Sequence, residues 1–186
     1  MSEIKAPIDA LSKFLSDSYT EEEVKKVYTE WPRSNVKVDL PSISVTTAGS
    51  GRFMPEMTTV AESNINDQGQ SILLLGEYDL DLQVDFWGSY KKQRETFYNK
   101  FMQLFAGQLN TIGTQGLSLP LQNYPVRGFN RFVARFDFND YNYLDGPNMA
   151  AKSEWRISLS LTAHYDRLQV VESSYITNIG LRTEIN

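Results

Sequence analysis

The feature that most constrains the fold is a change of hydrophobic period within residues 72–109. Residues 77–86 alternate between polar and apolar side chains, as in a strand with one buried face. The apolar face holds Tyr78, Leu80, Leu82, Val84 and Phe86, and the polar face holds Glu77, Asp79, Asp81, Gln83 and Asp85. After Gly88 the apolar residues recur at steps of three and four, which is the stripe of an amphipathic helix. This stripe comprises Tyr90, Arg94, Phe97, Phe101, Leu104, Phe105 and Leu109. We therefore expect a half-buried strand followed by a helix laid across the sheet, with Ser89 as the N-cap.

The same two patterns recur in other parts of the chain. Residues 7–31 read as helical in two stretches that end at Pro32, and Thr20 with Glu23 makes a capping box at the start of the second. Alternation predicts further strands at 40–46, 131–138 and 154–171.

Irregular segments separate these elements. Residues 49–70 predict either a long loop or an extended hairpin arm, and loops longer than about a dozen residues are usually functional. Residues 111–128 predict a connector, and residues 139–149 predict a turn-rich loop. The tail, 173–186, keeps enough alternation to add an edge strand or an arm.

These elements together predict an α+β fold. A mostly antiparallel sheet would carry one major amphipathic helix packed on its apolar face, with an N-terminal helix in addition. The length of 186 residues favours a single domain spanning 1–186, with extended loops or arms at about 49–70 and 139–149.

Composition excludes several classes of function. The net charge of −5 argues against broad adhesion to nucleic acid or to an anionic membrane. The absence of cysteine excludes thiol catalysis, thiolate metal sites and disulfides. The first residues lack the pattern of a secretory signal, and the longest apolar run, 72–75, is far too short for a membrane span. We expect a soluble protein that is used without export.

Four carboxylates on the polar face of the central strand are the first candidate site: Glu77, Asp79, Asp81 and Asp85. Side chains two residues apart on a strand are separated by about 7 Å, which is wide for two ligands of one metal ion. The simplest interpretation is a solvated face whose acids pair across strands with Arg131, Arg135 or Arg156. A third interpretation is an acidic face that lines a lumen, where like charge keeps passing DNA from binding.

Other residues give weaker signals. His164 is the single histidine, so a catalytic triad or a histidine metal site would have to be built around it alone, and an exposed strand residue is the simpler interpretation. The glycines of 49–52 lack the Lys-Ser/Thr of a phosphate-binding loop. Lys91, Lys92 and Arg94 open the main helix, where its dipole disfavours positive charge. They form either a solvated face or contacts to acids of a neighbouring subunit. No catalytic, cofactor or metal-binding residue is predicted, and an enzyme is not expected.

The order of elements resembles the tail terminator proteins of long-tailed bacteriophages. The resemblance rests on a leading helix at 8–16, the strand 40–45, a loop, and the strand 78–88 that runs directly into an amphipathic helix, with antiparallel strands closing the sheet. It covers most of the chain as a layout, with its best local match at 80–109.

The resemblance implies a structural virion protein of the tail and neck that assembles in the host cytoplasm. It would form a hexameric ring that caps the tail tube, stops its polymerisation and joins it to the neck or connector, and DNA would pass through without specific binding. The acidic face would line the lumen or an interface between subunits. Residues assigned to contacts between subunits are Lys91, Lys92, Arg94, Arg131 and Arg135.

Three alternatives stay open. The first is another neck, tube or baseplate subunit, with 49–70 and 139–149 supplying contacts to a sheath or connector. The second is a small metal-dependent hydrolase that uses the acids and His164. The third is a module that binds a peptide along an open sheet edge.

Overall fold

The computed structural model describes residues 5–31, 38–49, 51–65, 69–106, 116–144 and 155–172. Within these ranges the chain forms two helices and seven strands. They are α1 (Lys5–Ser18), β1 (Lys26–Tyr28), β2 (Ser42–Thr47), β3 (Arg52–Ile65), β4 (Gln70–Gly88), α2 (Lys91–Ala106), β5 (Leu117–Pro120), β6 (Val133–Leu144) and β7 (Trp155–Glu172).

The seven strands form one sheet built on two long neighbours, β4 and β7. The neighbours follow the order β1-β2-β4-β7-β6-β5, and β3 also pairs with β4. β4 and β7 pair antiparallel from Gln70 opposite Glu172 to Gly88 opposite Trp155. Along the other edge of β4, β3 covers the first half and β2 the second. β1 and β2 are parallel, so the sheet is mixed.

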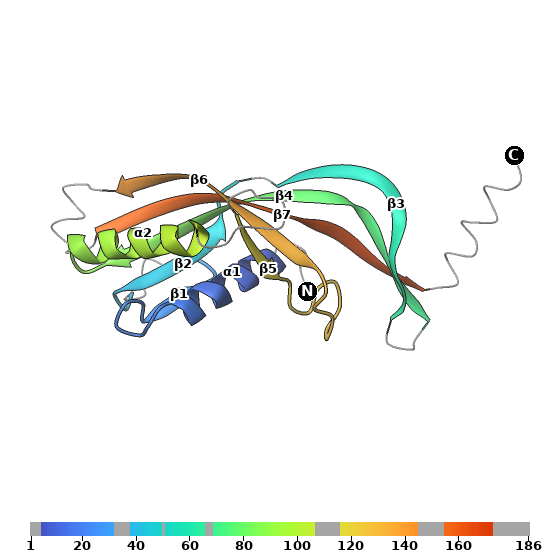
Figure 1. Ribbon diagram of the computed structural model, residues 1–186, viewed down its shortest axis with the longest axis horizontal. Coiled ribbons are helices and arrows are strands. Elements are labelled where there is room, and N and C mark those ends of the chain that lie inside the picture. The colour runs from blue at the N-terminus through green and yellow to red at the C-terminus, as the bar shows by residue number, and fades with distance from the viewer. Residues whose placement is uncertain are drawn as a thin grey trace, which may run out of the picture.

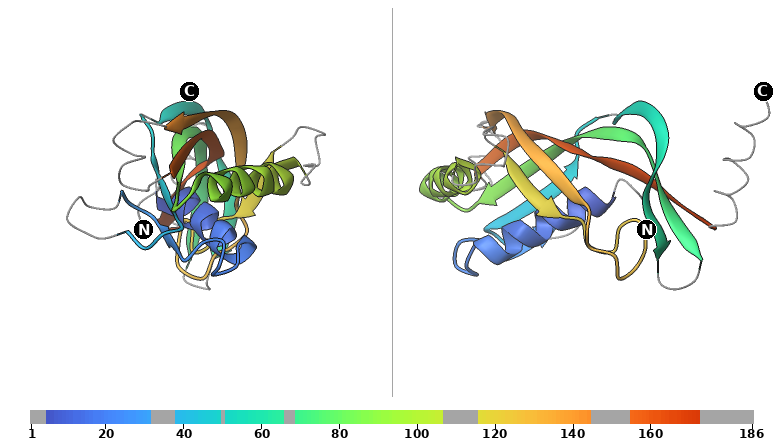
Figure 2. Two further views of the ribbon diagram at one scale, coloured as in Figure 1. Left: turned by 90° about the vertical axis from the view of Figure 1, so that its left-hand side faces the viewer. Right: turned by 45° about the vertical axis from the view of Figure 1, so that its right-hand side comes forward.

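Past the helices the sheet continues as a curved extension, which we call the arm (residues 52–65, 70–79 and 164–172). Figure 1 shows β4 and β7 running through the whole molecule, with α1 and α2 at one end and the arm at the other. The turned views of Figure 2 show the same sheet curling around the helices. The molecule is therefore a curled half-barrel that is extended on one side.

The curvature of the arm has a local cause. The β3–β4 register shifts between Pro55 and Thr59, and the β4–β7 register shifts between Leu74 and Gly76. Extra residues of this kind bend a strand and increase its twist. Gly76 adopts a φ of +143°, a conformation that side chains disfavour. The bend therefore lies where β3, β4 and β7 all depart from regular pairing.

Both helices pack on the same face of the sheet and share one core with it. Leu11 and Leu15 of α1 are fully buried, and Phe97, Phe101 and Phe105 of α2 are nearly so. The strands contribute the inward set that alternation predicts, including Leu80, Leu82, Val84 and Phe86 of β4 and Ile157, Leu159, Leu161 and Ala163 of β7. The buried faces of β4 and β7 are thus the ones that their alternation predicts.

The predicted fold class is wrong. Strands make up 55% of the described residues, and two short helices accompany a curled, mixed sheet in place of a mostly antiparallel sheet with one major amphipathic helix on its apolar face. The class was misjudged because two segments read as irregular are largely strand. Residues 52–65 form β3, the hairpin-arm alternative, and β6 extends to Leu144, through half of the predicted loop at 139–149.

Two local predictions also need correction. The first predicted helical stretch forms α1, which ends at Ser18, but the second does not run on to residue 31 as a helix, because residues 26–28 form β1. The capping box does form, since the amide of Thr20 donates to the Glu23 carboxylate at 2.9 Å, but it supports a single turn.

Ser89 lies one residue before the N-cap position of α2, and its amide donates to the side chain of Gln93 at 2.9 Å. The predicted tail strand at 173–186 and residues 145–149 lie outside the described residues.

Candidate functional site

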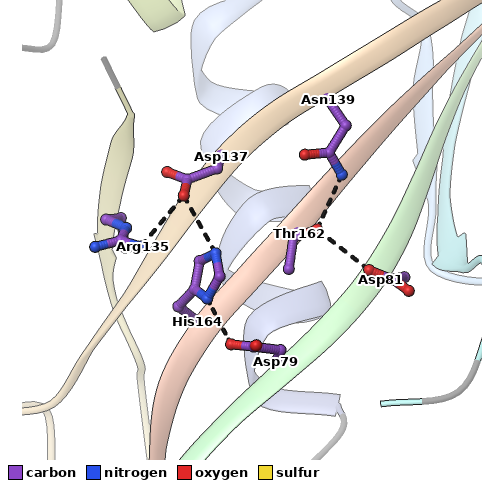
Figure 3. Close-up of polar contacts among 7 residues, drawn as sticks. All are labelled: Asp79, Asp81, Arg135, Asp137, Asn139, Thr162 and His164. Carbon is purple, nitrogen blue, oxygen red and sulfur yellow. Dashed lines mark hydrogen bonds and ion pairs between the residues drawn. The ribbon is translucent and has the colours of Figure 1, made fainter. Parts of the chain in front are cut away.

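The densest polar cluster on the sheet surface centres on His164 of β7. Its two ring nitrogens contact carboxylates on both neighbouring strands, as Figure 3 shows. Nδ1 lies 2.5 Å from Oδ1 of Asp79 on β4, and Nε2 lies 3.2 Å from Oδ2 of Asp137 on β6. Asp79 stands directly opposite His164 in the β4–β7 register. We call these two contacts the His164 bridge. It links three adjacent strands through side chains.

A second row of contacts runs beside the bridge. Nη2 of Arg135 donates to Oδ2 of Asp137 at 3.2 Å. The hydroxyl of Thr162 donates to Asp81 at 3.2 Å and accepts from the amide of Asn139 at 2.9 Å. An open cleft of about 390 Å³ lies here, and its lining residues are Arg52, Asp79, Asp81, Asp137, Asn139, Thr162 and His164.

The charges of this cleft define what it can do. A carboxylate only accepts hydrogen bonds, and a neutral imidazole has one N–H, so His164 donates to both aspartates only when both nitrogens carry protons. Asp166 lies two residues further along β7, where burial, and then the negative charges of Glu77 and Glu56, raise the pKa of its carboxyl. The lining of the cleft holds three aspartates and one arginine beside His164, so the cleft is acidic.

A second polar cluster surrounds Asp85, which is fully buried. One carboxylate oxygen accepts from Nε and Nη2 of Arg156 at 2.9 and 2.8 Å, and the other accepts from Gln83 at 2.8 Å. The Arg156 guanidinium lies over the rings of Trp31 and Trp87, 4.3 and 4.5 Å from their centroids. Asp85 thus pairs with Arg156, one of the arginines expected as partners, but the pair is enclosed and does not lie on the solvated face that the sequence predicts.

The acidic face predicted from alternation is thus divided by the structure. Glu77 and Asp81 are exposed, Asp79 is part of the His164 bridge, and Asp85 is enclosed. Asp85 cannot face a lumen in this structure because aromatic rings and Arg156 cover it. Alternation gives the correct side of the strand but does not show what covers that side.

The basic residues assigned to contacts between subunits mostly find partners within the chain. Lys91 lies 3.8 Å from Glu95, and Lys92 is exposed at the start of α2. Arg94 is 2% exposed. Its guanidinium lies 4.2 Å from the ring centroid of Tyr143 and 5.4 Å from that of Trp155. Arg94 therefore packs inside the chain, on the far end of β6 and β7.

The two arginines of the β6 region are also engaged. Arg131 pairs with Glu62 of β3 at 2.9 Å, and Arg135 pairs with Asp137. Arg131 remains largely exposed beside its partner within the chain.

Sequence reasoning missed an aromatic surface beside Arg94. The rings of Tyr98 and Tyr141 are 4.6 Å apart, and those of Tyr141 and Tyr143 are 5.4 Å apart. Burial, and then the neighbouring tyrosines, raise the pKa of Tyr98. The alternating tyrosines of the 139–149 segment were a signal for a strand that could have located this surface.

Among the described residues, no group of three or more His, Asp and Glu side chains is arranged to hold a metal ion. No helix in the described ranges has the length and apolar character needed to span a membrane.

No protein-family model matches the chain, and no curated protein matches it.

Proposed function

We propose that this chain is a non-catalytic structural subunit that assembles into a ring of the tail terminator type. In this proposal the ring caps the tail tube of a long-tailed bacteriophage and joins it to the neck. The unit that carries the resemblance is present, since β4 ends at Gly88 and α2 begins three residues later. This order supports the proposal at the level of layout.

The observation that carries the proposal is the open outer edge of the arm. β3 pairs with β4 along one edge and with no other described strand. Residues 55–61 are all exposed, and Met57 and Val60 keep 86% and 47% of their surface in solvent. An exposed strand edge with apolar side chains is a template for pairing with another chain. A monomer would leave this surface in water, whereas a ring with head-to-tail contacts would cover it.

The charge of the subunit fits the same role. The chain carries a net charge of −5, and Glu77 and Asp81 are the exposed members of the acidic face. In a ring these two acids would face the lumen or a basic surface of a neighbour. DNA that passes such a lumen is repelled, so it does not bind to the wall.

The test is the mass of the purified protein by light scattering at several concentrations, with negative-stain images of the same samples. Rings with a central hole are expected, and their stoichiometry separates a hexameric terminator from another neck, tube or baseplate subunit. Monomers at every concentration, also in the presence of tail tubes, would overturn the proposal.

A paired variant tests the arm. Met57→Lys with Val60→Lys places charge on the open edge and is expected to prevent ring formation while the monomer stays folded. Gln103→Lys is the matched control, because Gln103 is exposed on α2 at the opposite end of the molecule. If the arm variant and the control variant form rings to the same extent, the arm is not part of the interface between subunits.

A further inference from the structure

We propose that the His164 bridge is a pH-dependent fastening that holds the β5–β6 hairpin against the base of the arm and releases it when His164 loses a proton. The inference concerns contacts within one chain. It therefore stands or fails independently of ring formation.

The bridge lies where the sheet divides. β6 pairs with β7 from Leu144 opposite Arg156 to Arg135 opposite His164, and the paired register ends there. At the same level β2 has ended and β3 begins, with Arg52 opposite Asp79. Along its other edge β6 pairs with β5 over residues 133–136, and of these Val133 and Ala134 lie past its pairing with β7. A contact at His164 thus controls the fork between β6 and β7.

The charged groups that face His164 make the charge balance of the cleft depend on whether its ring is protonated. Arg52 comes from β3, Asp79 and Asp81 from β4, Arg135 and Asp137 from β6, and Asp166 from β7 itself. In the cleft and its Arg135 contact, three aspartates meet two arginines, and an imidazolium balances these charges. Asp166 adds a further acid with a raised pKa. Histidine is the side chain whose charge ordinarily changes between about pH 5 and 8.

Geometry selects which contact is lost on deprotonation. Asp79 is the closer acid and stands directly opposite in the ladder, whereas Asp137 reaches His164 from a diagonal position at 3.2 Å. Asp137 also keeps Arg135 as a second partner. The single N–H of the neutral ring therefore stays on Asp79, and the contact to β6 is released.

The segment that connects β5 and β6 is attached to the arm at further points, one of which is the pair between Arg131 and Glu62 of β3 at 2.9 Å. Tyr124 follows β5, and its hydroxyl donates to the carbonyl of Asp166 at 3.0 Å and accepts from the amide of Leu168 at 3.4 Å. These are edge groups of β7 just beyond the end of its pairing with β6. When the bridge opens, the contacts of Tyr124 and Arg131 and the last β6–β7 pairs at Arg135 and Phe136 are left to hold the hairpin, so local opening becomes more frequent as the pH rises.

The test combines hydrogen exchange with the NMR signals of the single histidine. Exchange of β5, β6 and Leu168 amides is compared between wild type and His164→Gln at the same pH, which cancels the intrinsic pH dependence of exchange. At about pH 5 the wild type is expected to exchange about tenfold more slowly at these amides, the effect of one charge-assisted hydrogen bond. At about pH 8 this difference is expected to vanish, because a neutral ring no longer donates to β6.

Asp137→Asn is expected to reproduce the loss at low pH. Asp140→Asn is its control, since the carboxylate of Asp140 accepts from the adjacent amide of Tyr141 at 2.7 Å. If His164→Gln does not fold, the ¹⁵N chemical shifts of the His164 ring in the wild type test the proposal instead, because they report which ring nitrogens carry a proton. Two protonated nitrogens at low pH, with slowed β6 exchange in the same range, support the bridge. The proposal would be overturned if the exchange rates of wild type and His164→Gln differed by the same factor at both pH values. It would also be overturned if β6 exchange stayed constant while the ring changed its protonation.

Discussion

Phe86 of β4 and Phe97 of α2 stack face to face, with ring centroids 4.3 Å apart and ring planes 8° apart. Phe97 also stacks on Tyr19, whose centroid lies 5.2 Å away, and the Tyr19 hydroxyl donates to the Phe97 carbonyl at 3.3 Å. Burial, and then the nearby charge of Glu23, raise the pKa of the Tyr19 hydroxyl far above its ordinary value. The stack joins the helix to the strand that precedes it and to the segment after α1.

Phe97→Ala is expected to destabilise the protein by about 3–5 kcal/mol, because it removes a buried ring and leaves a cavity beneath α2. The measurement is urea denaturation followed by circular dichroism. Thr96→Ala is the matched control, since Thr96 is exposed one residue earlier, and its effect should stay within about 0.5 kcal/mol. Similar losses for both variants would contradict the assignment of this ring to the core.

Arg156→Met is expected to cost about 3–5 kcal/mol, because it leaves the buried Asp85 carboxylate without its opposite charge. The double variant with Asp85→Asn should be less unstable than the two single losses add up to, with a coupling of about 0.5–3 kcal/mol. Denaturation followed by tryptophan fluorescence reports directly on the unfolding of this region, since the guanidinium lies over Trp31 and Trp87. Strictly additive losses would argue against the pair.

Gly76→Ala is expected to destabilise the arm. A Cβ at this position would lie 2.2 Å from the carbonyl oxygen of Met54, and the backbone there has a φ of +143°. The strained conformation alone costs about 1–3 kcal/mol, and the clash with backbone atoms adds to it. The measurement is the melting temperature together with hydrogen exchange of β3 amides.

Gly69→Ala is the control for this substitution. Gly69 also has a positive φ, +64°, but no atom lies within 4 Å of the position of its Cβ. Gly69→Ala should lower the free energy of unfolding by about 1 kcal/mol, which is the cost of the left-handed conformation for alanine. If Gly76→Ala destabilised the protein no more than Gly69→Ala does, the backbone of β3 would not approach Gly76 as closely as the structure shows.

The sequence allowed prediction of those elements whose own period reports their environment. β4, α2 and β7 each have one face in the core, so alternation and the three-to-four spacing located them. β3 could not be found in this way, because residues 55–61 are exposed on both faces and no alternation results. The Thr20–Glu23 box was a correct local signal, but hydrogen bonding of Lys25 to the Pro41 carbonyl directs the chain into β1.

The candidate site lay beyond prediction for a different reason. The individual acids and His164 were visible, but their meeting depends on the β4–β7 and β6–β7 registers. A register is set by the turns and by packing of both strands, and shifting it by one residue moves every side chain to the other face. The burial of Asp85 depends likewise on Arg156 and two tryptophans from separate parts of the chain.

The ion pair between Glu23 and Lys100 predicts a loss of stability in acid. Nζ of Lys100 lies 2.6 Å from the Glu23 carboxylate. The hydrogen bond from Lys100, and then that from the Thr20 amide, lower the pKa of Glu23 from its ordinary 4.5. Since the folded pKa is the lower one, the unfolded chain binds the proton more readily. The contribution of the pair is therefore complete above the unfolded pKa and is lost as the pH falls through the folded one.

Lys100→Met should accordingly lower the melting temperature near neutral pH by a small amount, because a partly exposed pair contributes about 0–1 kcal/mol. This difference from the wild type should shrink as the pH falls from about 6 to about 3, where Glu23 becomes protonated in both proteins. Lys25→Met, at an exposed lysine near the same turn, is the control and should give a smaller difference. A Lys100→Met difference that stays constant across this pH range would show that the lysine acts by packing of its alkyl chain against Tyr19, over whose ring its Nζ lies 4.8 Å from the centroid.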